Sequence, residues 1–301
     1  MALAEEIQGE VLYDVPMAEH TSFRVGGPVD YLVYPVDLTD LQKILRWCGK
    51  ERVDYFVLGR GSNLLVRDGG IRGLAISLSR GFIRIEELHP ERGKGALFAE
   101  AGESLGKLVE FTCGRGWAGL EFAAGIPGSI GGAISMNAGA FKGEMKDVLR
   151  SVRLMDTSGN VLEKSRVDLL FSYRSLKLPQ REIILGGEFQ LAPEGKEEVR
   201  SRMEEIIRRR AARHPHDLPS AGSIFQNPPQ GPAGKLIEEV GLKGTRSGDA
   251  QISEKHANII VNTGNARSSD VLELMEIVKA AVLEQRGIRL EPEIKIIGED
   301  S

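Results

Sequence analysis

We expect a mixed α+β fold, because three parts of the 301-residue sequence follow different patterns. Residues 1–80 alternate strand and helix patterns, which is typical of an α/β layer. Residues 81–192 are rich in strands and turns, with one helical stretch. Charged helical patterns begin at Lys196, after the break Leu191–Gly195. The sequence therefore predicts three domains, at residues 1–80, 81–192 and 193–301.

The first part combines short strands with one amphipathic helix. Thr39–Gly49 places Leu41, Ile44, Leu45 and Cys48 on one face, which predicts a helix capped by Asp37 or Thr39. The predicted strands are an interrupted one over Phe23–Tyr34 and two short ones, Tyr55–Leu58 and Gly73–Leu78.

The other two parts contain the remaining predicted elements. The middle part has a helix near Leu105–Gly114, a hairpin of Ser151–Met155 with Val161–Glu163, and a strand over Glu182–Leu191. In the last part, an apolar stripe of Val199, Met203, Ile206 and Ile207 predicts a helix from Lys196. Further helices are expected near Gly234–Val240 and over Ser268–Arg286, where Gly287 ends the helix, and a strand over Ile288–Ile297.

The composition argues against several classes of protein. Lys and Arg total 39 and Asp and Glu 43, a net charge of −4, which disfavours a nucleic-acid-binding protein. No run approaches the ~18 apolar residues of a membrane helix, and the N-terminus lacks a secretory signal. Only Cys48 and Cys113 are present, so we expect a cytoplasmic protein. The histidines and cysteines never reach metal-ligand spacing, so no metal site is expected.

Glycine is enriched, with 36 residues, and two loops concentrate it. The first, Gly59–Val66, follows a predicted strand and resembles a dinucleotide fingerprint. Leu64 stands at the last glycine position, and Gly69, Gly70 and Gly73 interrupt any following helix, so a Rossmann site is excluded. Converging N–H groups, with Ser62 and Asn63, could still bind phosphate, but on spacing alone a tight turn is the more common explanation.

The second loop, Gly119–Phe141, contains six glycines among small apolar residues and almost no charge. A flexible linker would be polar and would lack Ile126, Ile130 and Ile134. Close packing of a strand against a helix is one explanation. We favour a surface on which a flat or phosphate-bearing ligand lies against the main chain.

These loops carry a resemblance to a known family. Thr21–Pro28, Leu58–Val66 and Gly125–Gly132 resemble the flavin-binding half of the UDP-N-acetylenolpyruvoylglucosamine reductases. The resemblance continues, in the family's order and over nearly the whole chain, through Phe171–Arg174, Ser220–Pro228, Gly234–Gly244, Ser253–Asn258 and Leu290–Gly298.

The resemblance implies a fold, a reaction and two cofactors. The fold is of the FAD-binding vanillyl-alcohol-oxidase (PCMH) type, with two α/β subdomains and a C-terminal α/β substrate-binding domain. The reaction is the NADPH-dependent, FAD-mediated reduction of UDP-N-acetylglucosamine enolpyruvate to UDP-N-acetylmuramate, in peptidoglycan precursor biosynthesis. The short segment between Tyr173 and Arg200 has no room for the tyrosine-bearing insertion of the longer branch. We expect the shorter type, working as a monomer.

The resemblance also assigns roles to residues. Ser223 would donate a proton to C2 of the enolpyruvyl group, Arg174 would stabilise its carboxylate, and Glu293 would hold the enol form. Substrate contacts would come from Tyr173, Asn227 and Lys235. Cofactor contacts would come from Gly59, Arg60, Gly61, Ser62, Asn63, Leu64, Ala124, Gly125, Ile126, Pro127, Gly128, Ser129, Gly131, Gly132 and Asn137.

Without the resemblance, these side chains have ordinary explanations. Ser223 would be a loop hydroxyl, Arg174 a strand-end salt bridge, and Glu293 part of the solvated face of an edge strand. His256 is more often structural than mechanistic. The basic run Arg208–Arg213 follows several glutamates, so we expect a solvated helix face rather than a nucleic-acid contact.

The sequence departs from the family pattern at several positions. Gln226 stands where lysine is usual, which puts one basic contact to substrate or NADPH in doubt. The other departures are His20, Arg60, Leu176, Thr245 and Ser247–Asp249. Two alternatives stay open: an oxidase of a sugar or hydroxy acid on the same fold, and an inactive protein that binds flavin or a nucleotide sugar.

Overall fold

A computed structural model describes residues 3–89, 93–179, 181–215 and 217–300 of the chain. The chain divides into two compact units, and each combines segments that are distant in sequence. Unit 1 comprises residues 1–12, 31–59 and 74–210, and unit 2 comprises residues 13–30, 60–73 and 211–301. The sequence-based division into three domains stays a prediction.

A four-stranded sheet and a capped helix form the N-terminal region. The sheet has the order β1-β2-β5-β3, and β3 pairs in parallel with β5. Asp37 caps α2 by accepting a hydrogen bond from the Asp40 N–H at 2.8 Å, as one of the two predicted caps. The elements are α1 (Leu3–Glu6), β1 (Glu10–Pro16), η1 (Met17–Glu19), β2 (Pro28–Tyr34), α2 (Leu38–Glu51), β3 (Tyr55–Leu58) and β5 (Ile71–Ser77).

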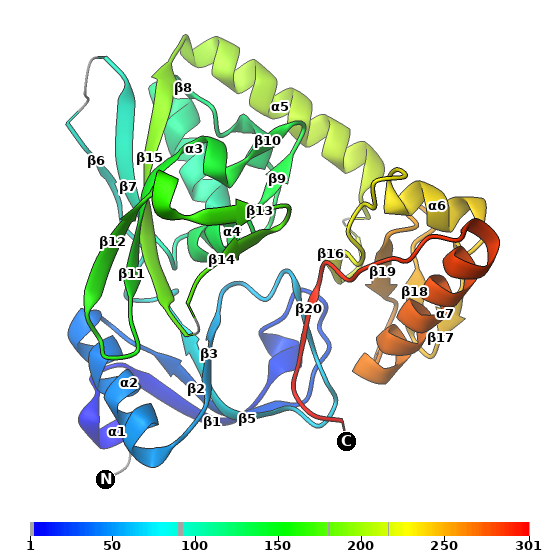
Figure 1. Cartoon of the computed structure of the whole chain (residues 1–301), viewed down its shortest axis with the longest axis horizontal. Coiled ribbons are helices and arrows are strands. Elements are labelled where there is room, and N and C mark those ends of the chain that lie inside the picture. Colours follow the sequence, from blue (N-terminus) through cyan, green and yellow to red (C-terminus); the bar gives the residue numbers. More distant parts are fainter. Residues whose placement is uncertain (1–2, 90–92, 180, 216, 301) are drawn as a thin grey trace. The chain divides into compact units, whose positions relative to one another are not determined.

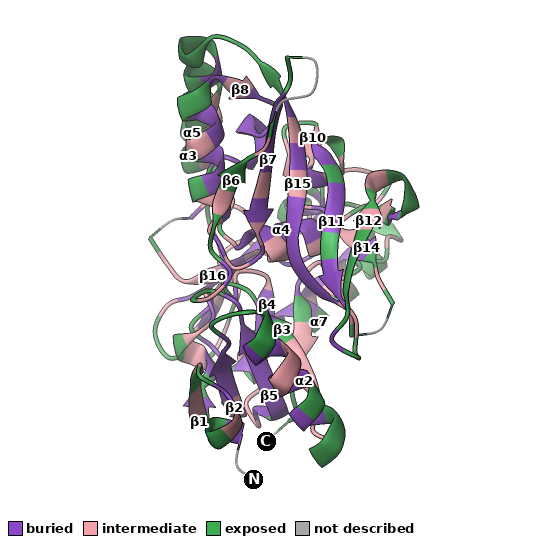
Figure 2. Ribbon diagram, turned by 90° about the vertical axis from the view of Figure 1, so that its left-hand side faces the viewer, coloured by how far each residue is buried: buried purple, intermediate pink, exposed green. Residues whose placement is uncertain are grey.

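A six-stranded sheet forms the centre of unit 1. Its order is β12-β11-β15-β7-β6, with β8 pairing to β15, and each of these pairings is antiparallel. Its strands are β6 (Ile85–Glu87), β7 (Gly95–Glu100), β8 (Trp117–Ala118), β11 (Leu149–Met155), β12 (Val161–Ser165) and β15 (Ile183–Pro193). β11 and β12 form the predicted hairpin. Figure 2 shows the central strands mostly in the colour of buried residues.

Helices and short elements cover this sheet (Figure 1). α4 packs against β15 and β7, and α3 contacts β8. Two small hairpins follow α4, β9 with β10 and β13 with β14. The elements are α3 (Leu105–Arg115), η2 (Glu121–Ala123), α4 (Ile130–Ser135), β9 (Gly139–Ala140), β10 (Gly143–Glu144), η3 (Met145–Asp147), η4 (Arg166–Asp168), β13 (Leu170–Ser172), β14 (Ser175–Lys177) and α5 (Lys196–Arg213).

Unit 2 contains a four-stranded antiparallel sheet of order β16-β19-β18-β17. α7 packs against β17 and β18 and contacts α6, and Gly287 ends α7 at a φ of +68°, as predicted. A separate parallel pair joins β4 to β20. The elements are β4 (Leu64–Val66), β16 (Ser220–Ser223), α6 (Ala233–Glu239), β17 (Arg246–Ser247), β18 (Ala250–Ile252), β19 (Ile259–Asn262), α7 (Ser268–Arg286) and β20 (Lys295–Ile297).

Two predicted strands are shorter than expected. The strand predicted over Ile288–Ile297 is reduced to β20, because Pro292 has no N–H for a continuous ladder. The strand predicted from Phe23 begins only at Pro28, because Arg24 takes a left-handed conformation with a φ of +54°.

Candidate active site

Backbone hydrogen bonds fix the second glycine-rich loop against the end of β7 and the start of α3. The N–H of Ile130 donates to the carbonyl of Glu103 at 2.9 Å, and that of Gly131 donates to the carbonyl of Ala101 at 2.8 Å. A Cβ added to Gly131 would lie 2.8 Å from the Ala101 Cβ. Close packing therefore explains part of the glycine content, as one of the two predicted explanations states.

The same loop also forms a cradle that fits a cofactor. Gly125 and Gly128 have φ values of +73° and +154°, which favour glycine. The buried Ser129 accepts from the Gly132 N–H at 3.2 Å, and a Cβ on Gly59 would lie 2.8 Å from the Ser129 Oγ. Within the described ranges, the N–H groups of Gly128 and Ser129 donate to no other residue. They are available to the diphosphate of a dinucleotide.

The first glycine-rich loop leads into a strand and not into the helix that a Rossmann site requires. Gly61 has a φ of +61°, and a Cβ there would lie 2.2 Å from the His20 carbonyl oxygen. Leu64 is the first residue of β4, and it lies opposite Lys295, the first residue of β20, in the parallel pair of these two strands. The Asn63 amide donates to the Glu293 carbonyl at 3.1 Å, and the Asn63 carbonyl accepts from the Lys295 N–H at 3.0 Å. This loop therefore positions the segment before β20, which carries Glu293.

Ser223 and Glu293 lie on segments that the structure joins directly. Ser223 ends β16, and the N–H of Glu293 donates to the carbonyl of the next residue, Ile224, at 2.7 Å. The Gln226 N–H donates to the Glu291 carbonyl at 2.9 Å, and its side-chain amide donates to the Pro292 carbonyl at 3.3 Å. Gln226 therefore holds the segment of Glu293 in place, a role that the departure from lysine did not suggest.

Asn258 is a positioning residue that the sequence did not single out. Its buried side chain accepts from the Phe225 N–H at 3.0 Å and donates to the Phe225 carbonyl at 2.8 Å. Its own carbonyl accepts from the Ile224 N–H at 2.9 Å. The two residues after Ser223, Ile224 and Phe225, are thus hydrogen-bonded to Asn258, and Ile224 also accepts from the Glu293 N–H. The signals were its place at the end of the segment Ser253–Asn258 and its position before the apolar run Ile259–Val261.

Tyr173 and Arg174 form the two-residue turn between β13 and β14. Arg174 has a φ of +54°, and its guanidinium lies 5.1 Å from the centre of the exposed Tyr173 ring. Non-glycine residues in this conformation are strained, and such strain gathers at functional sites.

Asn137, predicted as a cofactor contact, holds this turn. It is fully buried, and its amide donates to the Glu144 carboxylate at 2.6 Å and to the Ser172 carbonyl at 3.1 Å. Its side-chain oxygen accepts from the Lys146 N–H at 3.0 Å. Asn137 therefore positions the Tyr173–Arg174 turn, and its predicted contact with the cofactor stays a prediction.

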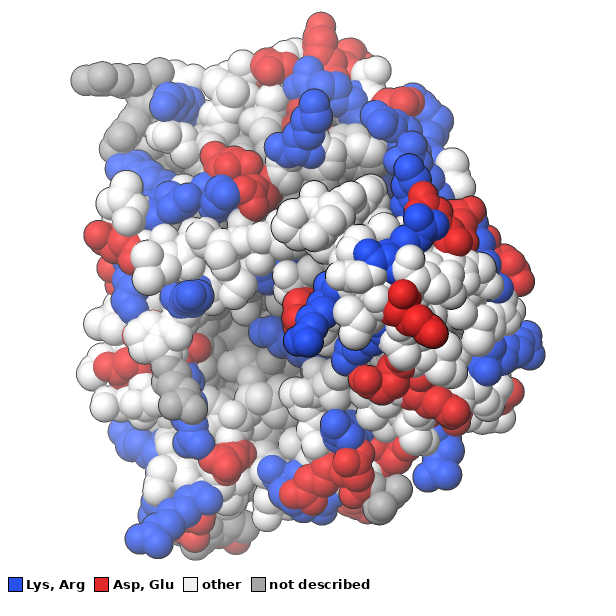
Figure 3. Space-filling model, turned by 45° about the vertical axis from the view of Figure 1, so that its right-hand side comes forward, with Lys and Arg blue, Asp and Glu red and all other residues white. Residues whose placement is uncertain are grey.

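The basic run on α5 is only partly solvated. Arg208 pairs with Glu204 and Glu205, as expected for an exposed face, and Figure 3 shows basic and acidic side chains interspersed over one face. Arg210 departs from that expectation. It is half-buried, its Nε is inaccessible to solvent, and its side chain lies against Gly125. The signal was its helical spacing from Met203 and Ile206, which continues the half-buried apolar stripe.

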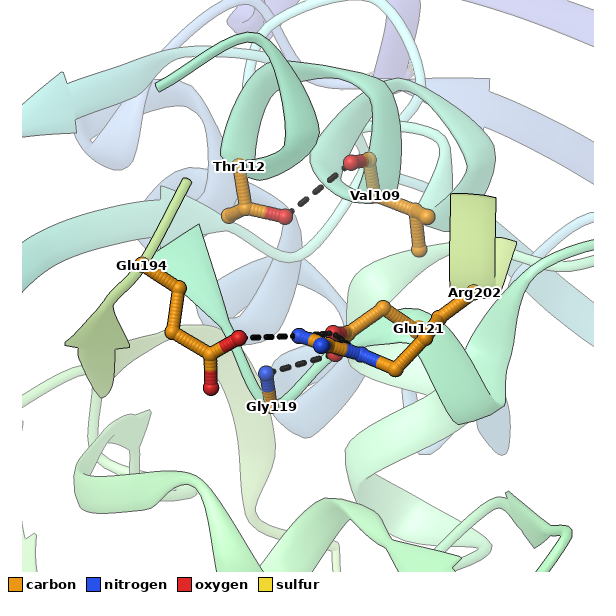
Figure 4. A network of polar contacts seen from close by, with 6 residues as sticks. All are labelled: Val109, Thr112, Gly119, Glu121, Glu194 and Arg202. Atoms are coloured by element: carbon orange, nitrogen blue, oxygen red, sulfur yellow. Dashed lines mark hydrogen bonds and ion pairs between the residues drawn. The ribbon is translucent and has the colours of Figure 1, made fainter. Parts of the chain in front are cut away.

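A polar network fixes the start of α5 to the second loop (Figure 4). Arg202 donates to the Glu121 carboxylate through Nε at 2.9 Å and Nη2 at 2.7 Å, and to the Glu194 carboxylate at 2.7 Å. Glu121 also accepts from the Gly119 N–H at 2.6 Å. Arg210 follows Arg202 by about two helical turns, so this network sets where Arg210 meets the loop.

The predicted substrate contacts have different surroundings. The side chain of Asn227 accepts from the Ala233 N–H at 2.9 Å, so it helps to begin α6. Lys235 is 72% exposed and lies 3.7 Å from the Glu239 carboxylate. His256 stacks on His214, with ring centres 5.3 Å apart, and burial lowers its pKa. Among the predicted cofactor contacts, Arg60 and Pro127 are exposed, Ser62 and Ile126 are half-buried, and Ala124 is buried.

Comparisons with known proteins find matches over most of the chain. An FAD-binding domain matches residues 29–165, and the C-terminal domain of UDP-N-acetylenolpyruvoylglucosamine reductase matches residues 214–297. The reductase of Syntrophus aciditrophicus is 46% identical over 294 residues, 98% of this chain and 94% of that protein. The reductase of Syntrophomonas wolfei is 44% identical and covers 95% of this chain and 94% of its own length.

A solved structure gives the same result. The crystal structure of UDP-N-acetylenolpyruvylglucosamine reductase (MurB) from Thermus caldophilus superposes with a TM-score of 0.80 at 37% identity, covering 96% of this chain and 99% of that one. The predicted α+β fold of the FAD-binding vanillyl-alcohol-oxidase type is confirmed. None of the helices in the described ranges is long and apolar enough to cross a bilayer.

Proposed function

The chain belongs to the UDP-N-acetylenolpyruvoylglucosamine reductase family, and on this premise we propose that Ser223, Glu293 and Arg174 carry its reaction. The protein is a flavin-dependent oxidoreductase that reduces UDP-N-acetylglucosamine enolpyruvate with NADPH, in peptidoglycan synthesis. Bound FAD supplies the hydride-transfer chemistry, which no amino-acid side chain provides. The observation that carries the proposal is the hydrogen-bonded joint between the segments of Ser223 and Glu293.

The reaction makes two demands on the protein. Hydride addition at C3 of the enolpyruvyl group builds negative charge at C2 and on the adjacent carboxylate. The site must stabilise that charge and then deliver a proton to C2. Both demands require groups held in fixed positions before the reaction begins.

Ser223 is suited to deliver the proton. Its neighbours Ile224 and Phe225 are each 1% exposed, so the hydroxyl belongs to a dry and rigid segment. On its other side, no atom of unit 2 crowds the position that a Cβ on Gly222 would take. A half-buried hydroxyl beside this opening can approach a substrate carbon.

Glu293 and Arg174 are suited to stabilise charge. The N–H of Glu293 donates to the Ile224 carbonyl, and the carbonyl of Glu293 accepts from the Asn63 amide. These two hydrogen bonds fix the backbone from which the carboxyl side chain extends. A carboxyl fixed in this way is positioned to hold the enol form of the intermediate. In unit 1, Arg174 lies in a turn that Asn137 fixes. A guanidinium can bind a carboxylate through two parallel hydrogen bonds, a bidentate contact.

The oxidase alternative is disfavoured by the second half of the chain. A sugar or hydroxy-acid oxidase would share only the flavin-binding half. The reductase C-terminal domain matches residues 214–297, a range that contains both Ser223 and Glu293. An inactive binding protein would have no need of these residues together with Arg174.

We further propose that the protein acts as a cytoplasmic monomer that does not bind nucleic acid. Both cysteines are buried and free, which suits a reducing compartment. The net charge is −4, and Arg208 of the basic run is paired with glutamates. Light scattering of the purified protein tests the oligomeric state, and a dimer mass would refute this part.

Ser223→Ala tests the proposed chemistry. Flavin reduction by NADPH should stay within about twofold of the wild type, while reoxidation by the enolpyruvyl substrate should slow by about 10²–10⁴-fold, because only the second half-reaction needs the proton at C2. Ser220→Ala, on the same strand, is the matched control and should change neither rate. Stopped-flow absorbance measures both steps, and equal slowing of the two half-reactions would refute the assignment of Ser223.

A further inference from the structure

The turn between β9 and β10 has a backbone conformation that its two residues rarely adopt. The strands pair through Ala140 and Gly143, so Phe141 and Lys142 form a two-residue turn. Their φ values are +50° and +71°. Two-residue turns with positive φ favour Asn-Gly or Gly-Gly, because bulkier side chains are strained there. Such strain gathers at ligand-binding sites, and the reaction outlined above uses neither residue.

The hairpin of β9 and β10 is held against the second glycine-rich loop. A Cβ on Gly143 would lie 2.6 Å from the Phe122 ring, so β10 lies directly on η2. The Glu144 carboxylate accepts from the buried Asn137 amide at 2.6 Å, which fixes the other end of β10. Because η2 ends two residues before Gly125, the strained turn is fixed at the edge of the cofactor cradle.

A second cation, Arg209 of α5, lies over this turn. Its guanidinium carbon is 5.0 Å from the centre of the Phe141 ring, and Figure 1 shows the hairpin beside α5. The next residue, Arg210, contacts Gly125, so Arg209 also lies beside the cradle. A guanidinium over the face of a ring keeps the N–H groups at its edge available to an anion. Phe141 therefore positions Arg209.

These two cations lack the carboxylate partners that their neighbours have. Lys142 and Arg209 are exposed, and neither pairs with a carboxylate among the residues that the structure describes. By contrast, Arg208 pairs with two glutamates of its own helix, and Lys146 pairs with Glu144. Two such positive charges, held beside a nucleotide-binding cradle, are suited to bind a phosphate group.

We propose that Lys142 and Arg209 bind a phosphate group of one of the two nucleotides that the reaction consumes, and so set the affinity for that nucleotide. NADPH carries a diphosphate and a 2′-phosphate that NADH lacks, and the substrate carries the diphosphate of UDP. The FAD diphosphate has its own donors, the N–H groups of Gly128 and Ser129. The proposal rests on the reductase activity and is independent of the three residues proposed to carry the chemistry.

Calorimetric titration of the FAD-loaded protein with NADP⁺, NAD⁺ and UDP-N-acetylmuramate tests the proposal and identifies the phosphate. K142M and R209M should each raise one dissociation constant about tenfold, because each removes a charge-assisted contact. A rise for NADP⁺ alone would identify the 2′-phosphate, and an equal rise for NADP⁺ and NAD⁺ would identify their diphosphate. A rise for UDP-N-acetylmuramate alone would identify the diphosphate of UDP.

Three further variants separate phosphate binding from effects on the fold. K142R keeps the charge and should stay within about threefold of the wild-type affinity. R208M is the matched control, because Arg208 is paired within α5, and it should change no dissociation constant. K142G relieves the strained turn, so it should raise the Tm and yet weaken binding as much as K142M. A merely structural turn would give the higher Tm without weaker binding.

Two outcomes would overturn the proposal. The first is wild-type affinity for all three ligands in K142M and R209M. The second is weaker retention of FAD with these affinities unchanged, which would assign both cations to the bound cofactor. Failure of the Ser223 assignment would leave every dissociation constant as it is in the wild type, so the two proposals fail separately.

Discussion

At the scale of single residues, the site depends on backbone conformations that few side chains adopt. Gly128 has a φ of +154° in the cofactor cradle, Gly61 has a φ of +61° in the first loop, and Arg174 has a φ of +54° at the tip of its turn. The two glycines occur where only a residue without Cβ takes the conformation at low cost. Arg174 is held in place by the Asn137 bond to Ser172.

Replacing Gly128 tests the cradle directly. Gly128→Ala should destabilise the folded protein by about 1–3 kcal/mol, because L-residues rarely adopt this backbone conformation, and it should reduce the amount of bound FAD. Gly114→Ala is the control, since Gly114 lies within α3 and a Cβ there meets no atom within 4 Å. The flavin-to-protein absorbance ratio measures the effect, and a ratio equal to that of the wild type would contradict the cradle.

Sequence patterns located the glycines but not the side chains that brace the site. Gly125 and Gly128 stood out because small residues cluster around them. The roles of Asn137 and Asn258 depend on segments that the fold brings from elsewhere, Ser172 in one case and Phe225 in the other. Arg210 did not stand out within the basic run, because charge alone does not distinguish a solvated arginine from a half-buried one.

At the scale of elements, carboxylates set where two of the helices begin. Asp37 caps α2 from within its own segment, and this cap could be predicted because it adjoins the helix in sequence. Asp68 caps α7 from a distant loop, by accepting from the N–H groups of Ser268 at 2.7 Å and Ser269 at 3.1 Å. A local sequence pattern cannot predict this cap, because Asp68 and Ser268 are 200 residues apart in the sequence.

The Asp68 cap predicts a pH-dependent contribution to stability. Burial alone would raise the pKa of Asp68, but the hydrogen bonds from Ser268 and Ser269 outweigh it and lower the pKa. The stabilising contribution is therefore complete above the unfolded-state pKa of about 4 and is lost as the pH falls through the lower folded value. Asp68→Ala should reduce the free energy of unfolding at pH 7 by about 1–2 kcal/mol.

Denaturant unfolding of the wild type and of Asp68→Ala measures this difference at several pH values. The difference should be the same at pH 7 and pH 5 and should shrink below pH 4. Asp300→Ala removes an exposed carboxylate that pairs with Arg67, and it should cost less than ~1 kcal/mol. A difference between wild type and Asp68→Ala that grows on acidification would contradict the cap.

At the scale of the whole molecule, the chain is not organised in sequence order. The core of unit 2 includes Phe23, Val25 and Leu65 from the N-terminal part of the chain. Ser22 donates to the Ser220 carbonyl at 2.7 Å, and Asn262 donates to the Phe23 carbonyl at 3.3 Å. The sequence predicted the class of fold and most of the elements, because those follow from local periodicity. It did not predict this interleaving, which depends on contacts between distant segments.

The central claim is that this chain passes hydride from NADPH through FAD to an enolpyruvyl sugar nucleotide. One anaerobic titration tests it directly, with the flavin absorbance of the purified holoenzyme recorded after NADPH and again after UDP-N-acetylglucosamine enolpyruvate. We predict that NADPH bleaches the flavin and that the substrate restores the oxidised spectrum. Bleaching that the substrate does not reverse, or a protein that takes up no FAD, would contradict the account.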